Sequence, residues 1–139
     1  MVRPQITEDS NGLIRQPLSC RTGMLYNVFM TFDEYQKQAL TTVISSSDAF
    51  KDSLHWVLGI NGEAGEVAEK VKKIIRDKDG VISQQDKAEL AKELGDVLWY
   101  LAVFAHDLGF SFDDVARNNL EKLSSRKARG ALKGSGDNR

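Results

Sequence analysis

The fold is decided by residues 60–109, INGEAGEVAEKVKKIIRDKDGVISQQDKAELAKELGDVLWYLAVFAHDLG. Apolar residues recur in this stretch at three- and four-residue spacing, first as far as residue 76 and again over 84–108, which is the period of an amphipathic helix. Between the two runs lies the polar sequence Asp77-Lys78-Asp79-Gly80, and its glycine tolerates the positive φ of a turn. The stretch therefore predicts two long helices with a short connection, which favours antiparallel packing.

Helix signals also lie on both sides of this stretch. Thr31, followed three residues later by Glu34, has the form of an N-terminal capping box and predicts a first helix over about 32–45. The polar run 45–48 then starts the long helix that reaches residue 76, and Ser111 opens a fourth helix that ends near Gly130. No segment alternates apolar and polar residues as a strand does, so we expect an all-α chain of four helices without a sheet.

Length and composition fit a single domain. The chain has 139 residues, 41% of them apolar, and its 19 basic residues nearly balance 20 acidic ones. We expect a flexible N-terminal extension over 1–30, a folded domain over 31–130 and a disordered tail over 131–139. The near-zero net charge predicts neither nucleic acid nor a membrane surface as a partner. With one cysteine and no apolar run of about 20 residues, a cytoplasmic location fits best.

Acidic residues repeat in the same pattern in the two long helices. Residues 63–67 and 93–97 both read E-x-G-[E/D]-V. In each helix the first acid lies at the edge of the apolar stripe and the second lies slightly further out on the same side. The stripe of the earlier helix comprises Ile60, Ala64, Val67, Val71, Ile74 and Ile75. Antiparallel packing is therefore expected to bring four carboxylates together: Glu63, Glu66, Glu93 and Asp96.

Four neighbouring carboxylates favour a bound divalent cation, because like-charge repulsion and burial both disfavour their ionised forms. Oxygen ligands without histidine or thiolate select a hard ion, so we expect magnesium, with manganese as a possible substitute. A di-iron site is disfavoured because neither His55 nor His106 follows a glutamate by three residues. The alternative is a solvated acidic flank that pairs with Lys70, Lys73 and Lys92.

Several basic and polar side chains are candidates for holding phosphate. Lys70 and Lys73 follow Glu66 on the same side of the helix, where they could neutralise phosphate oxygens or remain solvated near a helix end. Asn119 and Arg126 fall within the apolar stripe of the fourth helix, where a polar side chain needs a partner. That partner could be phosphate, the acidic cluster, a helix cap or another subunit.

Aromatic residues suggest where a nucleotide base could bind. Tyr100 lies one helical turn after Asp96, so its ring either borders the acidic site and stacks on a base or packs in the core. Trp99 points away from the apolar stripe, which indicates a pocket or a subunit interface. Gln36 and Trp56 are further candidates for the base pocket.

Taken together, these motifs resemble the all-α nucleoside triphosphate pyrophosphatases, in particular MazG-like proteins. The resemblance covers about residues 31–130. The matching segments are Glu34-Tyr35-Gln36, residues 62–67, residues 93–101, and the set Asn119, Lys122, Leu123 and Arg126 on the fourth helix.

The resemblance implies a four-helix bundle that associates into dimers or tetramers. It implies that the four acids bind magnesium, that Lys122 and Arg126 help to hold phosphate, and that a nucleoside triphosphate is hydrolysed to the monophosphate and pyrophosphate. Either Glu63 or Glu66 would activate the water, and house-cleaning of the nucleotide pool is the expected role. The alternatives are an enzyme like phosphoribosyl-ATP pyrophosphohydrolase and a non-catalytic helical oligomerisation module.

Overall fold

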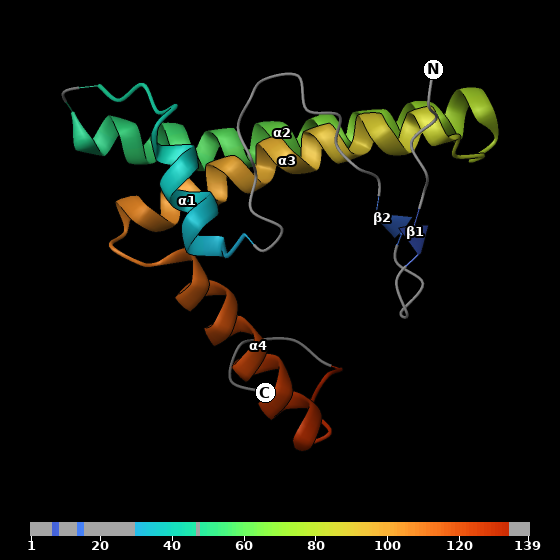
Figure 1. The fold of residues 1–139 in the computed structure, drawn as a ribbon. Helices are drawn as coiled ribbons and strands as arrows, with labels where there is room; N and C mark the ends of the chain where they lie inside the picture. The colour runs from blue at the N-terminus through green and yellow to red at the C-terminus, as the bar shows by residue number, and fades with distance from the viewer. Residues whose placement is uncertain (1–6, 9–13, 16–29, 47, 134–139) are drawn as a thin grey trace.

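The computed structural model describes residues 7–8, 14–15, 30–46 and 48–133. Within these ranges the chain forms four helices, as the sequence predicts. Their bounds are α1 Phe32–Leu40, α2 Ala49–Lys78, α3 Gln84–Asp107 and α4 Phe112–Ala128. Figure 1 shows α2 and α3 side by side and antiparallel, α1 crossing near one end of the pair, and α4 extending away from it.

A small strand pair departs from the expectation of no sheet. The strands β1 (Thr7–Glu8) and β2 (Ile14–Arg15) pair antiparallel, with Thr7 opposite Arg15. Strands of two residues are too short to show a period-two pattern, which explains why the sequence did not reveal them. The rest of the predicted extension up to residue 29 and residues 134–139 of the predicted tail lie outside the described part of the chain.

The turn between α2 and α3 confirms the predicted helical hairpin. Asp79 and Gly80 adopt positive φ angles of 50° and 78°, and the Gly80 N–H donates to the Ile74 carbonyl at 3.2 Å. The helix thus ends at Lys78, two residues later than expected, because Asp79 is the first residue to leave the right-handed region. Ser83 and Asp86 then cap α3 reciprocally through backbone and side-chain hydrogen bonds.

The first helix is shorter than the sequence suggests. It ends at Leu40 rather than near residue 45. The hydroxyls of Thr41 and Thr42 donate to the carbonyl oxygens of Gln38 and Ala39, both at 2.7 Å. These bonds satisfy carbonyls at the helix end with side-chain donors, so another helical turn is not needed to pair them.

The buried core lies where α1, α3 and the start of α4 meet. Ala102, Ala105 and Phe112 form its centre. The α3 end that leads into it lies one residue before the predicted residue 108. Gly109 follows with a φ of 80°, and the Phe110 N–H donates to the Ala105 carbonyl at 2.9 Å. This tight ending fixes the start of α4 against α1.

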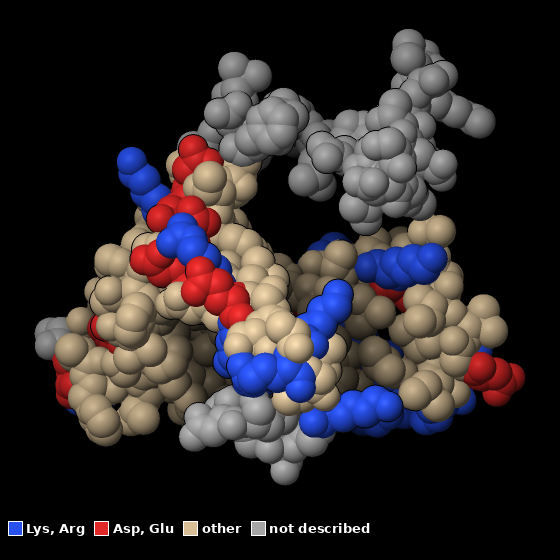
Figure 2. All heavy atoms as spheres, turned by 90° about the horizontal axis from the view of Figure 1, so that it is seen from below, with Lys and Arg blue, Asp and Glu red and all other residues tan. Residues whose placement is uncertain are grey.

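Outside this core, much apolar surface remains exposed within a single chain. Ile74 is the buried member of the predicted α2 stripe, whereas Val71 and Ile75 are 39% and 62% exposed. The face seen in Figure 2 carries acidic and basic side chains scattered among uncharged residues. Among the helices of the described ranges, none combines the length and the apolar character that crossing a membrane requires.

Candidate functional site

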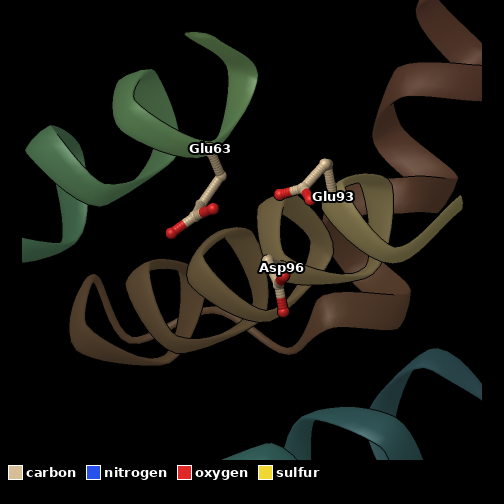
Figure 3. Close-up of side chains that lie close together, drawn as sticks. All are labelled: Glu63, Glu93 and Asp96. Carbon is tan, nitrogen blue, oxygen red and sulfur yellow. The ribbon is translucent and has the colours of Figure 1, made fainter. Parts of the chain in front are cut away.

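Three of the four predicted acids converge between the two long helices. Glu63 projects from α2, and Glu93 and Asp96 project from α3. Each offers a carboxylate oxygen, and these three oxygens all lie within 4.8 Å of one another. Figure 3 shows the three side chains facing the same space between the helices. The predicted convergence of the repeated pattern is therefore present for these three residues, which we call the three-acid cluster.

Glu66 lies outside the three-acid cluster. It stands three residues after Glu63 on α2, so its direction is turned by about one-sixth of a helical turn. This rotation leaves Glu66 exposed, while Glu63 is half-buried. The negative charge of Glu66 nevertheless acts on the cluster, because it is one of the charges that raise the pKa of Glu63.

The electrostatics of the cluster favour the binding of a cation. Burial raises the pKa of the Glu63 carboxyl above its ordinary value, and the negative charges of Asp96, Glu93 and Glu66 raise this pKa further. The donors are all carboxylate oxygens, the ligand type that magnesium and manganese prefer. The donor set therefore fits a hard divalent cation that would relieve the repulsion.

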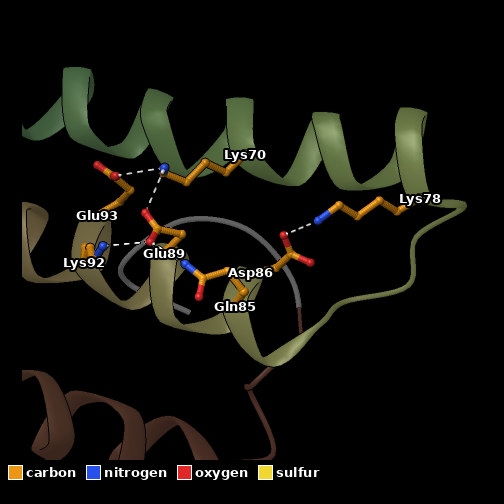
Figure 4. A network of polar contacts seen from close by, with 7 residues as sticks. All are labelled: Lys70, Lys78, Gln85, Asp86, Glu89, Lys92 and Glu93. Carbon is orange, nitrogen blue, oxygen red and sulfur yellow. Dashed lines mark hydrogen bonds and ion pairs between the residues drawn. The ribbon is translucent and has the colours of Figure 1, made fainter.

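One lysine pairs with the cluster, and others pair with acids next to it, as the alternative interpretation of a paired acidic flank expects. The Lys70 ammonium lies 3.3 Å from Glu93 and 3.8 Å from Glu89 (Figure 4). Lys73 instead pairs with Glu69 of its own helix at 3.5 Å. Of the two predicted phosphate ligands on α2, Lys70 alone is thus in ion-pair contact with the three-acid cluster.

Aromatic side chains pack together one to two helical turns from the cluster. The Tyr100 ring meets the Trp99 ring edge-on at 4.9 Å and lies 6.4 Å from the Trp56 ring, both measured between centroids. Trp56 is only 3% exposed. The Trp99 indole N–H donates to the Thr42 hydroxyl at 2.9 Å. The outward Trp99 thus finds a partner within its own chain, in a group that includes the candidates Trp56 and Tyr100.

Gly59 is a site neighbour that sequence reasoning did not single out among the helical glycines. A Cβ atom at Gly59 would lie 2.1 Å from Cε1 of Tyr100, which is far inside contact distance. The same atom at Gly62, Gly65 or Gly95 would meet none of the described residues within 4 Å. Only the packed structure distinguishes these positions, since all four glycines stand in helical sequence. Gly59 therefore allows the Tyr100 ring to lie directly on the backbone of α2.

Gln36, a predicted base-pocket residue, takes part in the core rather than in the three-acid cluster. Gln36 is buried in the core, where its amide donates to the carbonyls of Ala102 at 2.9 Å and Phe110 at 3.3 Å. These bonds tie α1 to α3 and to the turn before α4. The role of Gln36 in base binding stays a prediction.

The candidates on α4 lie on the helix that extends away from the α2–α3 pair in Figure 1. Arg126 is buried at 6% exposure, as its place in the apolar stripe predicts. Asn119 is exposed, so the described residues of the same chain do not cover it, and its partner stays a prediction. Asn119 and Lys122 line a groove together with Phe110 and Phe112.

Comparisons with known proteins relate the sequence of this chain to a family. The family model described as the MazG nucleotide pyrophosphohydrolase domain matches residues 52–130, more than half of the chain. The Gene 37 protein of Mycobacterium phage L5 is 48% identical in an alignment of 114 residues that covers 79% of this chain and all of the phage protein. The uncharacterized protein YvdC of Bacillus subtilis (strain 168) is 40% identical in an alignment of 70 residues that covers 46% of this chain and 65% of that protein. No solved structure matches the chain.

Proposed function

Because this chain belongs to the MazG nucleotide pyrophosphohydrolase family, we propose that it is a magnesium-dependent hydrolase of nucleoside triphosphates. The reaction cleaves the bond between the α and β phosphates and yields a nucleoside monophosphate and pyrophosphate. The observation that carries the proposal is the three-acid cluster inside the matched segment, whose oxygens lie within 4.8 Å of one another. House-cleaning of the nucleotide pool is the role that we propose for this activity.

Glu63, Glu93 and Asp96 are the residues that would hold the ion. A bound magnesium ion supplies positive charge that offsets the charge on the phosphate oxygens and makes a bound water more acidic. We assign the general base to Glu66, which was predicted as both ligand and base, because it lies one turn from Glu63 but outside the cluster. Its carboxylate accepts a proton from the attacking water while the phosphoric anhydride bond breaks.

Two further groups would position the substrate. Lys122 and Arg126 of α4 are proposed to hold phosphate, in line with the family resemblance, and Lys70 stands next to the cluster on α2. The Tyr100 ring, with Trp56 behind it, offers an aromatic surface on which a base or a sugar can pack.

We also propose that a second copy of the chain covers the exposed apolar face of α2. An open groove on this face is lined largely by apolar side chains. Its apolar lining residues are Ala64, Val67, Ala68, Val71 and Ile75. Exposed apolar surface of this kind favours burial against another molecule. Multi-angle light scattering should report a dimer or tetramer, and a Val71→Glu variant should lower the measured mass towards that of one chain.

A melting experiment tests metal and nucleotide binding. The full chain is heated with a chelator, with magnesium, and with magnesium plus a non-hydrolysable nucleotide analogue. Binding to the folded state alone raises the melting temperature, so we expect a rise with magnesium and a larger rise with both ligands. A helical oligomerisation module without a metal site would melt at the same temperature in all three conditions.

A screen for pyrophosphate release tests the reaction itself. The enzyme is incubated with standard and damaged ribo- and deoxynucleoside triphosphates and with phosphoribosyl-ATP. We expect pyrophosphate and monophosphate from nucleoside triphosphates, only in the presence of magnesium. Turnover confined to phosphoribosyl-ATP would instead assign the chain to the related enzyme activity.

A further inference from the structure

Lys70 connects the two long helices beside the three-acid cluster. Its ammonium lies 3.3 Å from Oε1 of Glu93 and 3.8 Å from Oε2 of Glu89. The Lys70 and Glu93 side chains are 29% and 17% exposed, so this contact is partly screened from water. Within the described ranges, Lys70 is the only lysine or arginine in ion-pair contact with the cluster. Lys70 therefore offsets part of the cluster's negative charge.

The position of Lys70 makes it a competitor of a bound cation. An ammonium in contact with Glu93 carries one positive charge, and a divalent cation on the same carboxylate would stand within several ångströms of it. Repulsion between a single and a double positive charge at such a separation is substantial, even when water weakens it. The two cations therefore disfavour each other at Glu93.

Glu89 provides a second acceptor for the same ammonium. It stands one helical turn before Glu93 on α3 and is not part of the three-acid cluster. Figure 4 shows Glu89 held by its own helix: Lys92 and Gln85 both donate to Oε1, at 2.7 and 2.9 Å. Its other oxygen, Oε2, faces Lys70. A small movement of Lys70 would thus exchange Glu93 for an acceptor that is already in place.

We propose that Lys70 is a positioning residue that pairs with Glu93 when the site lacks a metal ion and moves to Glu89 when a divalent cation binds. The pair of acceptors then sets the metal affinity of the site, since the strength of the Lys70–Glu89 contact determines how readily Lys70 leaves Glu93. This inference rests on the proposed function, because it takes the three-acid cluster as the metal site.

Manganese binding by the full chain, without nucleotide, tests the inference. The concentration of free manganese is followed by electron paramagnetic resonance during a titration. We expect Lys70→Gln to lower the dissociation constant about fivefold, because the competing charge is gone. We expect Glu89→Gln to raise it about threefold, because Lys70 loses its second acceptor and stays on Glu93. Circular dichroism and melting curves establish that each variant is folded.

Matched variants separate this exchange from a general effect of charge. Lys73→Gln and Glu69→Gln make the same charge changes in a pair that lies within α2, and each should leave the dissociation constant within about twofold of the parent. In the double variant Lys70→Gln with Glu89→Gln, the effect of the Glu89 change should disappear, because Glu89 acts through Lys70. A merely electrostatic role of Glu89 would preserve its effect in that background.

The outcomes distinguish this inference from the proposed function. If the parent chain binds manganese but Lys70→Gln binds it equally or more weakly, Lys70 is not a competitor and the inference is overturned. It is also overturned if Lys73→Gln tightens binding as much as Lys70→Gln does. If the parent chain binds no manganese at millimolar concentrations, the metal site of the proposed function fails, and this inference fails with it.

Discussion

The α2–α3 pair contains two carboxylate environments of opposite character. At the turn, Asp86 accepts hydrogen bonds from Lys78 and Ser83, and these contacts lower its pKa from 3.8 to about 2. Further along the same two helices, Glu63 faces Asp96 and Glu93, and burial with like charge raises its pKa. Each of the two acids lies at a contact between the helices. Among the described residues, however, only Asp86 finds cationic and hydroxyl partners that favour its ionised form.

The two environments distinguish an acid that stabilises the fold from an acid that would bind a cation. A carboxylate whose ionised form is favoured in the folded state stabilises the protein at neutral pH, as Asp86 does. A carboxylate whose ionised form is disfavoured destabilises the metal-free protein at neutral pH, and Glu63 is in this position. This loss of stability in the metal-free protein is expected at a site whose carboxylates bind a cation. The two acids should therefore respond in opposite ways to neutral substitution.

The largest expected effect is the loss of catalysis when a cluster carboxylate is neutralised. Asp96→Asn removes one of the three ligands that we assign to the metal, so pyrophosphate release should fall at least about 100-fold. Asp96 is exposed, so the helical content should remain that of the parent. Steady-state assays with saturating magnesium and far-ultraviolet circular dichroism measure the two quantities. Full turnover by Asp96→Asn would remove the cluster from the mechanism.

The fold could be predicted largely from local signals. The N-caps Thr31, Ser83 and Ser111 and the turn at Gly109 after α3 depend on residues within one helical turn, so the local sequence is enough to predict them. The predicted end of α1 was wrong because the hydroxyls of Thr41 and Thr42 donate to carbonyls at the helix end and no further helical turn forms. The spacing of apolar residues does not indicate whether side chains or a further turn will pair these carbonyls.

The site could be predicted only in part. The repeated acidic pattern predicted the three-acid cluster, because the acids keep their positions beside the apolar stripe when the two helices pack. The pattern did not predict that Glu66 lies outside the cluster, because the position of Glu66 depends on how α2 and α3 are rotated about their axes. Nor did it reveal that Tyr100 rests on Gly59 or that Lys70 faces two acids of α3, since contacts across helices depend on their relative register.

A substitution at Gly59 should affect the surroundings of Glu63 and leave those of Asp86 unchanged, because Gly59 lies one helical turn from Glu63 and far from the turn that holds Asp86. A Cβ in Gly59→Ala would overlap the Tyr100 ring, so the ring or the helices must shift. Overpacking of this kind costs about 1–3 kcal/mol. We expect a clear fall in melting temperature together with a higher KM, whereas the Asp86 pKa measured by nuclear magnetic resonance should stay near 2.

Gly62→Ala is the matched control for this prediction, because its Cβ would meet no atom of the described part of the chain within 4 Å. It should melt at or slightly above the parent temperature, since alanine favours helix more than glycine does. Equal losses of stability in the two variants would show that the Tyr100 contact is not the cause.

A smaller effect is expected at the turn. Asp86→Asn removes the charge that pairs with Lys78 and weakens the cap of α3, so the melting temperature should fall by a few degrees at pH 7. The folded pKa of Asp86 is below its ordinary value, so its stabilisation is present above pH 3.8 and is lost as the pH falls through about 2. The difference between parent and variant should shrink over that range, while turnover at neutral pH remains within about twofold of the parent.

The smallest expected effect has the opposite sign. Glu63→Gln removes a carboxylate whose ionisation is disfavoured by burial and by the charges of Asp96 and Glu93. In the presence of a chelator at pH 7.5, the variant should therefore melt about one or two degrees above the parent. The folded pKa is raised, so the cost of ionising Glu63 develops as the pH rises from 4.5 through the folded pKa, and the advantage of the variant should vanish below pH 4.5. Magnesium should reverse the order at pH 7.5, because it stabilises only a chain with the complete cluster. If the variant melts below the parent without metal, Glu63 stabilises the folded protein as Asp86 does, and the two acids do not differ in their effect on stability.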